Sequence, residues 1–181
     1  RGETEYLDLQ AHFYGQKENI DLYGQFYSGF FLNPRGYASS DNGLFYLRPD
    51  LKIIELGASY QHVFNNKRFS TRASQLQNEW QKKSAGSFLL GGELYFGKVT
   101  ADSSVYPSVI QTDPLPIVNQ MNFYEIGPGV GYGYTLVIAR HFYITAILSV
   151  NANYNVTTYD GPGPIKSISG FDLQKSNPLN N

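Results

Sequence analysis

The segment from Thr4 to Leu32 constrains the fold of this chain more than any other stretch, because two runs of alternating residues flank a single turn in it. From Leu7 to Phe13 every second residue is apolar, and polar or tyrosine residues stand between them. A similar alternation runs from Ile20 to Leu32. A period of two over about ten residues indicates a β-strand, and a glycine with polar neighbours between two such runs indicates a hairpin. The segment therefore predicts two long antiparallel strands.

The same period returns along the rest of the chain and predicts an all-β protein. The further strands are expected at Leu51–Phe64, Phe69–Leu76, Ser87–Val99, Asn122–Val137 and Phe142–Val156, with residues 157–181 as a loop or tail. Short turns are expected at 15–18, 65–68 and 138–141. In bacterial barrels the short turns share one side. The third turn meets this rule only if a further short strand forms around Val105–Gln111, where Pro107 is unfavourable.

The composition of the polar positions favours a membrane barrel over a soluble, lipocalin-like barrel. Strands that face water usually carry lysine, which limits edge-to-edge aggregation. Here Tyr, Gln, Asn, Ser and Gly dominate the polar positions, and the lysines fall in expected loops or at strand ends, as Lys52 and Lys98 do. A lysine or arginine facing lipid at the membrane midplane costs about 2–4 kcal/mol. The alternation therefore predicts an antiparallel transmembrane β-barrel whose polar positions line a lumen.

Size and charge exclude several classes of function. The 181 residues suit one domain, and the net charge of −1 gives no reason to expect a nucleic-acid partner. There is no cysteine, hence no disulfide or thiolate metal site, and no cofactor is expected. No apolar run reaches the 18 residues of a transmembrane helix. Because the chain starts without an export signal and ends in a polar tail, whereas a barrel must close, we expect flanking strands.

Charged and polar residues on the lumen-facing positions are expected to form one hydrogen-bonded network. Its members are Asp8, His12, Asp21, Glu55, Arg72, Glu93 and Glu125. Carboxylates in a low dielectric need cations or hydrogen bonds, so Arg72 is expected to neutralise Glu55, Glu93 or both. His12 could also act as a general base beside a carboxylate, but any barrel with a polar lumen presents such groups, so a structural hydrogen-bond network is the favoured interpretation.

Four glycines share one face of the Asn122–Val137 strand. They are Gly127, Gly129, Gly131 and Gly133. A phosphate-binding loop would need a helix after the glycines, whereas strand alternation continues here. Glycines on one strand face allow bending or the close approach of another group, which predicts a shaping or docking role. The group above them could be an aromatic ring such as Tyr95 or Tyr143, or a plug, lipid chain or partner segment.

A tryptophan and two lysines suggest where a membrane interface would lie. Trp80, the only tryptophan, is followed closely by Lys82 and Lys83. Amphipathic rings and lysines with long apolar stems settle at membrane interfaces. We therefore expect these three residues at one boundary of the membrane. No spacing of histidine and acidic residues indicates a metal site, and no Ser-His-Asp order stands out.

Several stretches resemble the domain of unknown function 4421 family. They are LDLQAHFYGQ with IDLYGQFY (Leu7 to Tyr27), RPDLK (Arg48 to Lys52), FNNKRFS (Phe64 to Ser70), NEWQKKSAGSFLLGG (Asn78 to Gly92) and IARHFYITA (Ile138 to Ala146). The resemblance covers most of the chain from Leu7 to Tyr154. It implies a protein exported by Bacteroidetes-type bacteria, an outer-membrane β-barrel, and further strands on either side of this segment. It implies no activity and no functional residues.

These observations predict an outer-membrane β-barrel that serves as a structural or accessory subunit of a cell-envelope assembly. Its expected partners are outer-membrane lipid or lipopolysaccharide and other envelope proteins. Two alternatives remain open. One is a small pore or a barrel that binds a ligand in its lumen, and the other is an outer-membrane hydrolase that uses His12.

Overall fold

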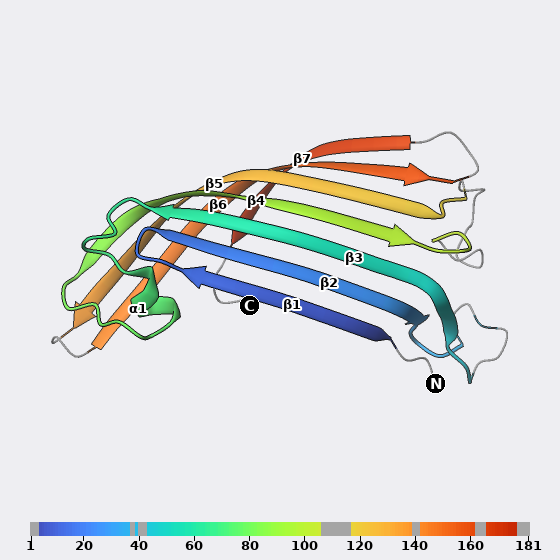
Figure 1. The fold of residues 1–181 in the computed structure, drawn as a ribbon, viewed down its shortest axis with the longest axis horizontal. Helices are drawn as coiled ribbons and strands as arrows, with labels where there is room; N and C mark the ends of the chain where they lie inside the picture. Colours follow the sequence, from blue (N-terminus) through green and yellow to red (C-terminus); the bar gives the residue numbers. More distant parts are fainter. Residues whose placement is uncertain are drawn as a thin grey trace.

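Seven antiparallel strands form a single curved sheet in the computed structural model (Figure 1). The structure describes residues 4–36, 39, 43–105, 117–138, 142–161 and 166–176, the last with side chains at 167–171. The elements are β1 (Glu5–Tyr14), β2 (Glu18–Leu32), β3 (Tyr46–Val63), α1 (Thr71–Gln75), β4 (Ala85–Thr100), β5 (Gln120–Ile138), β6 (Phe142–Asp160) and β7 (Lys166–Ser176). Each strand pairs with the next one in the chain. The prediction of an all-β antiparallel protein is confirmed.

The strands pair in a register that places their apolar residues on the same side of the sheet. In one row across the sheet, Leu9 pairs with Gly24, Gly24 with Leu56, and Leu56 with Phe96. The row continues through Tyr124 and Val156. Because side chains alternate with a period of two, matching registers keep every such row on one side of the sheet. We call this side the apolar face and the opposite side the polar face.

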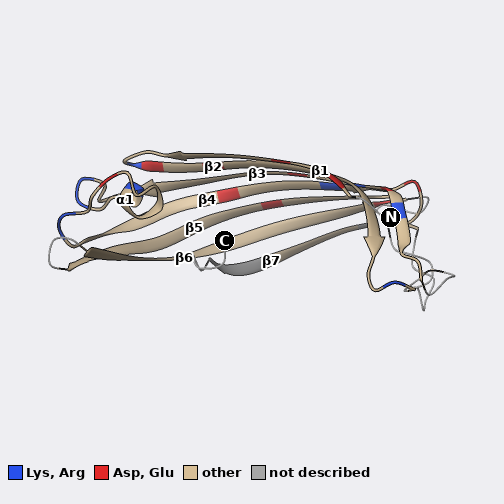
Figure 2. Ribbon diagram, turned by 90° about the horizontal axis from the view of Figure 1, so that it is seen from below, with Lys and Arg blue, Asp and Glu red and all other residues tan. Residues whose placement is uncertain are grey.

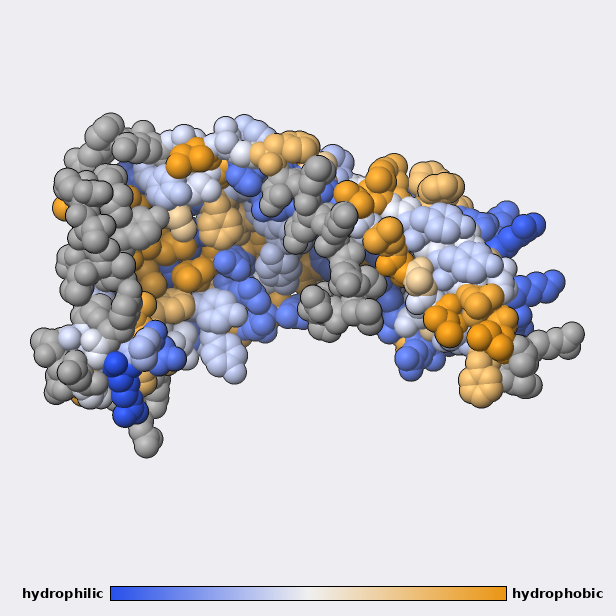
Figure 3. All heavy atoms as spheres, turned by 180° about the vertical axis from the view of Figure 1, so that it is seen from behind, coloured by the Kyte–Doolittle hydropathy of each residue, from blue (hydrophilic) through white to orange (hydrophobic). Residues whose placement is uncertain are grey.

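The sheet curves around its polar face. Along β5 and β6 most apolar-face residues are exposed, while the polar-face residues between them are buried or half-buried. In the view from behind, hydrophilic and hydrophobic residues lie side by side in the hollow (Figure 3). Polar side chains thus crowd together on the concave side, and apolar side chains fan outward on the convex side.

The sheet is not closed. β1 pairs only with β2, and β7 only with β6, so the two edge strands do not pair with each other. The structure thus shows an open antiparallel sheet, and the larger barrel of which this segment is predicted to form a part remains a prediction. The apolar alternation that predicted the strands carries no information on closure, because a strand in an open curved sheet and one in a barrel show the same period.

The segment Phe69–Leu76 is not a strand, contrary to the prediction, but contains the short helix α1. Ser70 caps this helix, and its Oγ accepts a hydrogen bond of 3.1 Å from the backbone N–H of Ala73. Capping supplies a partner for a backbone donor that the first helical turn leaves free. The alternation here is short, and burial of Thr71 and Ala73 on one side of a single turn decides the conformation instead.

This correction removes the difficulty with the turns. Without a strand at Phe69–Leu76, the ends of β1, β3 and β5 lie at one end of the antiparallel sheet, and the ends of β2, β4 and β6 lie at the other. No extra strand is needed around Val105–Gln111. Val105 lies outside the strands, and residues 106–111 lie outside the described part of the chain.

Residues 157–181 were predicted as loop or tail, and the structure corrects this too. β6 continues to Asp160, and β7 runs from Lys166 to Ser176 with eleven residues in register with β6. Thr157 and Tyr159 suit a strand because β-branched and aromatic side chains pack well on a sheet. The loop predicted for the Gly-Pro-Gly-Pro sequence falls mostly on residues 162–164, which lie outside the described part of the chain.

A small buried core lies at the end of the sheet that carries α1. Val63, Phe69 and Leu89 form it, and Ala85 and Ile147 pack against it. All but Phe69 come from polar-face positions of the strands. The β3–β4 connection therefore folds over this end of the polar face, which it covers.

Candidate functional site: the polar face

Glu93, Glu125 and Asn153 form the central group of the polar face. The Nδ2 amide of Asn153 donates to Oε1 of Glu93 at 2.7 Å and also to Oε1 of Glu125. Tyr95 donates its hydroxyl to the other oxygen of Glu93 at 3.0 Å. Asn153 is only 1% exposed. Two carboxylates thus share one buried amide donor, which satisfies charge that would be costly to bury alone.

Asn153 was not among the predicted site residues. Its sequence signal is only that of a polar residue among the alternating asparagines 151, 153 and 155 of β6, which does not distinguish it from its neighbours. What singles it out is its position beside Gly127 of β5. A Cβ atom on Gly127 would collide with Oδ1 of Asn153. Because Gly127 has no side chain, Asn153 can reach across β5 to Glu93 on β4.

His12, Asp21 and Ser59 form a second group on β1, β2 and β3. His12 Nδ1 lies 2.7 Å from Asp21 Oδ1, and Ser59 Oγ donates to Asp21 Oδ2 at 3.2 Å. The three residue types are those of a Ser-His-Asp triad, but the arrangement differs. In a triad the serine bonds to the histidine, which accepts its proton. Here the serine bonds to the aspartate, so the geometry offers no activated nucleophile.

Asp8 belongs to a third group, in which two glutamines donate hydrogen bonds to its carboxylate. Gln25 donates to Asp8 Oδ2 at 3.3 Å and Gln10 to Asp8 Oδ1 at 3.4 Å. Glu55 stands in the same row of the sheet, opposite Gln25. The predicted single network is therefore divided into separate groups, which hydrogen bonds between neighbouring strands hold together locally.

Arg72 lies apart from these carboxylates, contrary to the prediction. It is in α1, and its Nη1 lies 3.1 Å from Oε1 of Glu79 within the β3–β4 connection. The ion pair is about one-third exposed on both sides. The expected pairing with Glu55 or Glu93 required a strand at Phe69–Leu76. Because that segment is helical, the guanidinium is held over the end of the sheet instead.

The β3–β4 connection is fastened to the polar face by hydrogen bonds from several strands. Tyr143 of β6 donates its hydroxyl to the carbonyl of Ala73 at 2.6 Å. Thr71 donates to Asn19 of β2 at 3.2 Å, and Asn19 donates to Gln61 of β3 at 3.2 Å. We call the segment 64–84 the cap. These contacts close one end of the hollow with the chain's own residues.

The glycine face of β5 accommodates different groups along its length. Cβ atoms at Gly127 and Gly129 would collide with Asn153 and Asn151 of β6, and one at Gly133 would lie 2.6 Å from Cζ of Phe69 in the cap. Close approach of neighbouring side chains accounts for these three glycines, and the shaping or docking role of this face stays a prediction. The aromatic neighbours proposed from sequence differ: Tyr23 and Tyr95 lie over Gly57 instead.

At the opposite end of the sheet, Arg48 and Asp50 form an ion pair that the sequence analysis missed. Arg48 Nε and Nη2 donate to the two oxygens of Asp50 at 2.9 and 3.0 Å. Ser103 also donates to Asp50, and Arg48 reaches the carbonyl of Val105. The hydrogen bonds from the Arg48 guanidinium hold the pKa of Asp50 well below its usual range. This pair fastens residues 103–105 to the start of β3.

Trp80, Lys82 and Lys83 are exposed in the cap, at the end of the sheet away from Arg48 and Asp50. Gln81 between them is buried and holds the segment, because it accepts from Ser70 N–H and donates to the carbonyls of Arg68 and Lys83. Alternation of a buried glutamine with exposed neighbours points the tryptophan and lysines outward. Their predicted place at a membrane boundary remains a prediction.

Among the described residues, no group of three or more histidine or acidic side chains is placed to hold a metal ion. None of the described helices is both long enough and apolar enough to cross a membrane.

The fold and its two contrasting faces define an all-β meander with an apolar convex side and a hydrogen-bonded polar concave side. The chain matches the family described as Domain of unknown function (DUF4421) over residues 1–177 and belongs to it. Neither the curated proteins nor the solved structures contain a match.

Proposed function

We propose that this chain forms part of a bacterial outer-membrane β-barrel that acts as a structural or accessory subunit of a cell-envelope assembly. The observation that carries the proposal is the apolar face, which continues across all seven strands. Apolar-face residues that are exposed include Leu7, Leu9, Leu56, Leu94, Tyr124, Ile126, Val130, Tyr132, Leu136, Ile144, Leu148, Tyr154 and Phe171. Soluble monomers rarely expose an apolar surface of this extent, and lipid would cover it.

The placement of charge supports the same proposal. Basic residues lie toward the two ends of the strands, and acidic residues occur along them (Figure 2). The mid-strand acids Asp8, Glu93 and Glu125 belong to the polar face, where hydrogen bonds satisfy them. A strand that crosses lipid requires this division, because only the lumen side tolerates charge at low cost.

The cap favours an accessory role over that of a pore. It covers one end of the polar face through Phe69, Thr71 and Ala73, which are each at most 1% exposed. A pore would require a continuous aqueous path along that face. Nor does the hydrolase alternative gain support, because Ser59 bonds to Asp21 and not to His12.

Spin labels test the orientation of the two faces. Single cysteines replacing Leu94 and Leu148 should carry labels that collide with dissolved oxygen and are shielded from an aqueous nickel chelate when the protein is reconstituted in vesicles. Labels replacing Gln25 and Asn155 on the polar face are the matched controls and should show the reverse. If labels at Leu94 and Leu148 were as accessible to the nickel chelate as the control labels, the proposal would be contradicted and a soluble barrel favoured.

A further inference from the structure

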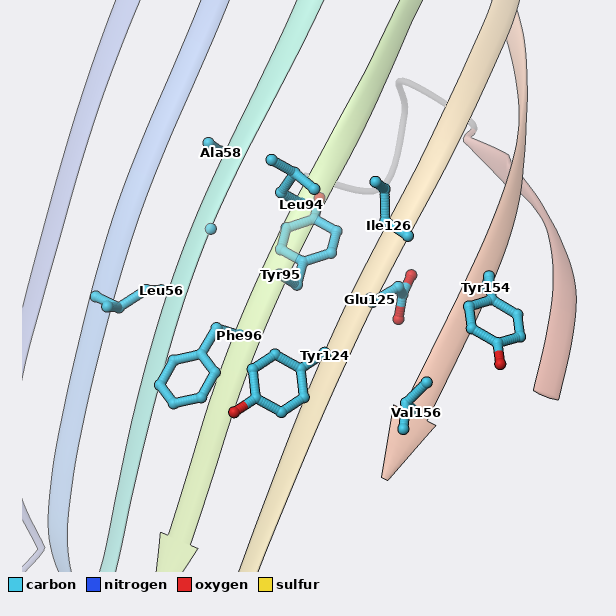
Figure 4. A pocket seen from close by; sticks show the side chains of 11 residues that line it. Leu56, Ala58, Leu94, Tyr95, Phe96, Tyr124, Glu125, Ile126, Tyr154 and Val156 are labelled. Atoms are coloured by element: carbon cyan, nitrogen blue, oxygen red, sulfur yellow. The ribbon is translucent and has the colours of Figure 1, made fainter. Parts of the chain in front are cut away.

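A groove of about 540 Å³ crosses the middle of the apolar face from β3 to β6 (Figure 4). Its floor contains Ala58, which stands in a row between the larger side chains of Leu22 and Leu94. Phe96 and Tyr124, whose rings lie 5.2 Å apart, border it on the next row. The small side chain of Ala58 between these two leucines leaves a depression on the apolar face.

Two lysines stand just beyond the groove on the same face. Lys98 is the next apolar-face position after Phe96, and it lies opposite Ile54. Lys52 lies opposite Thr100 and is exposed. Lys52 and Lys98 are therefore diagonal neighbours on adjacent strands, about 7–8 Å apart. Neither forms an ion pair with any residue that the structure describes.

The acidic residues near this pair leave its charge available. Asp50 is already paired with Arg48. Glu5 occupies the same row as Lys52 but is separated from it by β2, and Asp160 lies beyond β5 from Thr100. A separation of two strands is about 10 Å, which is close to the Debye length at physiological salt.

We propose that this site binds one anionic membrane phospholipid, with an acyl chain in the groove and its phosphate between Lys52 and Lys98. The inference rests on the proposed function, since the groove meets acyl chains only if the apolar face contacts lipid. Charge complementarity selects the headgroup, because two ammonium groups beside an apolar groove match a phosphate joined to an acyl chain. Lys98 can extend its apolar stem along the face and place its charge at the boundary.

Brominated lipids test the site in the full chain reconstituted in vesicles. In a Trp80→Phe background, Phe96→Trp reports on the groove and Leu148→Trp reports on the apolar face away from the lysines. Brominated phosphatidylglycerol in unbrominated phosphatidylcholine should quench Phe96→Trp with a relative affinity about fivefold or more above that of brominated phosphatidylcholine. Each lysine contributes about 1 kcal/mol near an anionic surface, which corresponds to about fivefold. Leu148→Trp should show no preference.

Variants separate the two parts of the site. Lys52→Gln with Lys98→Gln should abolish the preference at Phe96→Trp, whereas Lys82→Gln with Lys83→Gln in the cap should leave it intact. Ala58→Phe fills the groove and should reduce the preference while both lysines remain. If the Phe96 position is intolerant of tryptophan, Tyr124→Trp reports on the same row.

The outcomes distinguish this inference from the proposed function. Equal quenching of both reporters by both lipids would mean bulk lipid only, which overturns the inference and leaves the membrane orientation supported. A preference that survives the double lysine variant would also overturn it. Absence of quenching by brominated phosphatidylcholine at both positions would overturn the inference and the proposed function together.

Discussion

Asn153 on β6 donates a 2.7 Å hydrogen bond to Glu93 on β4, two strands away, by passing over Gly127 of β5. The same amide also reaches Glu125 on β5. One side chain therefore ties three strands together on the polar face. The contact requires glycine at position 127, because a side chain there would collide with Asn153.

Replacing Asn153 with leucine should destabilise the protein because two half-buried carboxylates lose their shared buried donor. A hydrogen bond to a charged group contributes about 1.5–3 kcal/mol, and we expect a loss of that size in the free energy of unfolding. Urea titration of the protein folded in vesicles measures it. In a double-mutant cycle with Glu93→Gln, a coupling energy of about 0.5–3 kcal/mol is expected. Strict additivity would contradict the contact.

Gly127→Ala should destabilise the protein by about 1–3 kcal/mol, the usual cost of overpacking a filled site. The added methyl would meet the Asn153 carboxamide. Gly24→Ala is the matched control, because the nearest atom there is the flexible Cδ2 of Leu56 at 3.3 Å. The control should be neutral or slightly stabilising. Equal losses in the two variants, measured by the same urea titration, would show that lost strand flexibility and not the collision is responsible.

The change in the free energy of unfolding caused by Leu148→Arg tests whether the apolar face contacts lipid. In lipid, an arginine at the middle of the membrane costs about 2–4 kcal/mol. Phe142→Arg, at the end of the same strand, should cost about 0–1 kcal/mol. Both residues are exposed, so in water each substitution would change the free energy of unfolding by only about 0.5 kcal/mol. A small and equal effect at both positions in vesicles would argue against a lipid-facing surface.

Arg72→Ala should cost only about 1 kcal/mol or less, because its ion pair with Glu79 is partly exposed and therefore screened by water. Glu79→Ala should cost a similar amount, and the double variant should cost little more than either single one. The measurement is again the free energy of unfolding. A loss of about 3–5 kcal/mol on removing Arg72, as expected for a buried pair, would mean that it neutralises a polar-face carboxylate after all.

The Arg48–Asp50 pair predicts an acid-sensitive contact at the loop end of β3, beyond the lysines that end the apolar face. Because the pKa of Asp50 is lower in the folded protein than in the unfolded chain, its ionised form stabilises the fold. This contribution is fully present above the unfolded pKa of about 3.9 and is lost as the pH falls toward the folded pKa. The stability difference between wild type and Asp50→Asn should thus be constant from about pH 7 to 5 and shrink below about pH 4. A difference that persists unchanged at pH 3 would contradict the pair.

Local alternation was sufficient to predict most of the sheet and the assignment of residues to its two faces. Leu94 and Leu148 lie on the apolar face, and Asp21 and Glu93 on the polar face, as their positions in the alternating runs indicate. The physical reason is that the two sides of a strand follow from its own geometry, whichever strands are its neighbours. The signal failed where it was short, because at Phe69–Leu76 burial against other strands outweighed the local pattern.

An all-β chain with one apolar and one polar side follows from the residue order, since side-chain alternation is a property of each strand alone. Which polar residues meet follows from the three-dimensional fold, because contacts such as Asn153 with Glu93 depend on the register of β4, β5 and β6 and on the space above Gly127. The tertiary structure also decided that Arg72 pairs with Glu79 in the cap. Register, curvature and long-range packing are relations between strands, and no single stretch of sequence contains them.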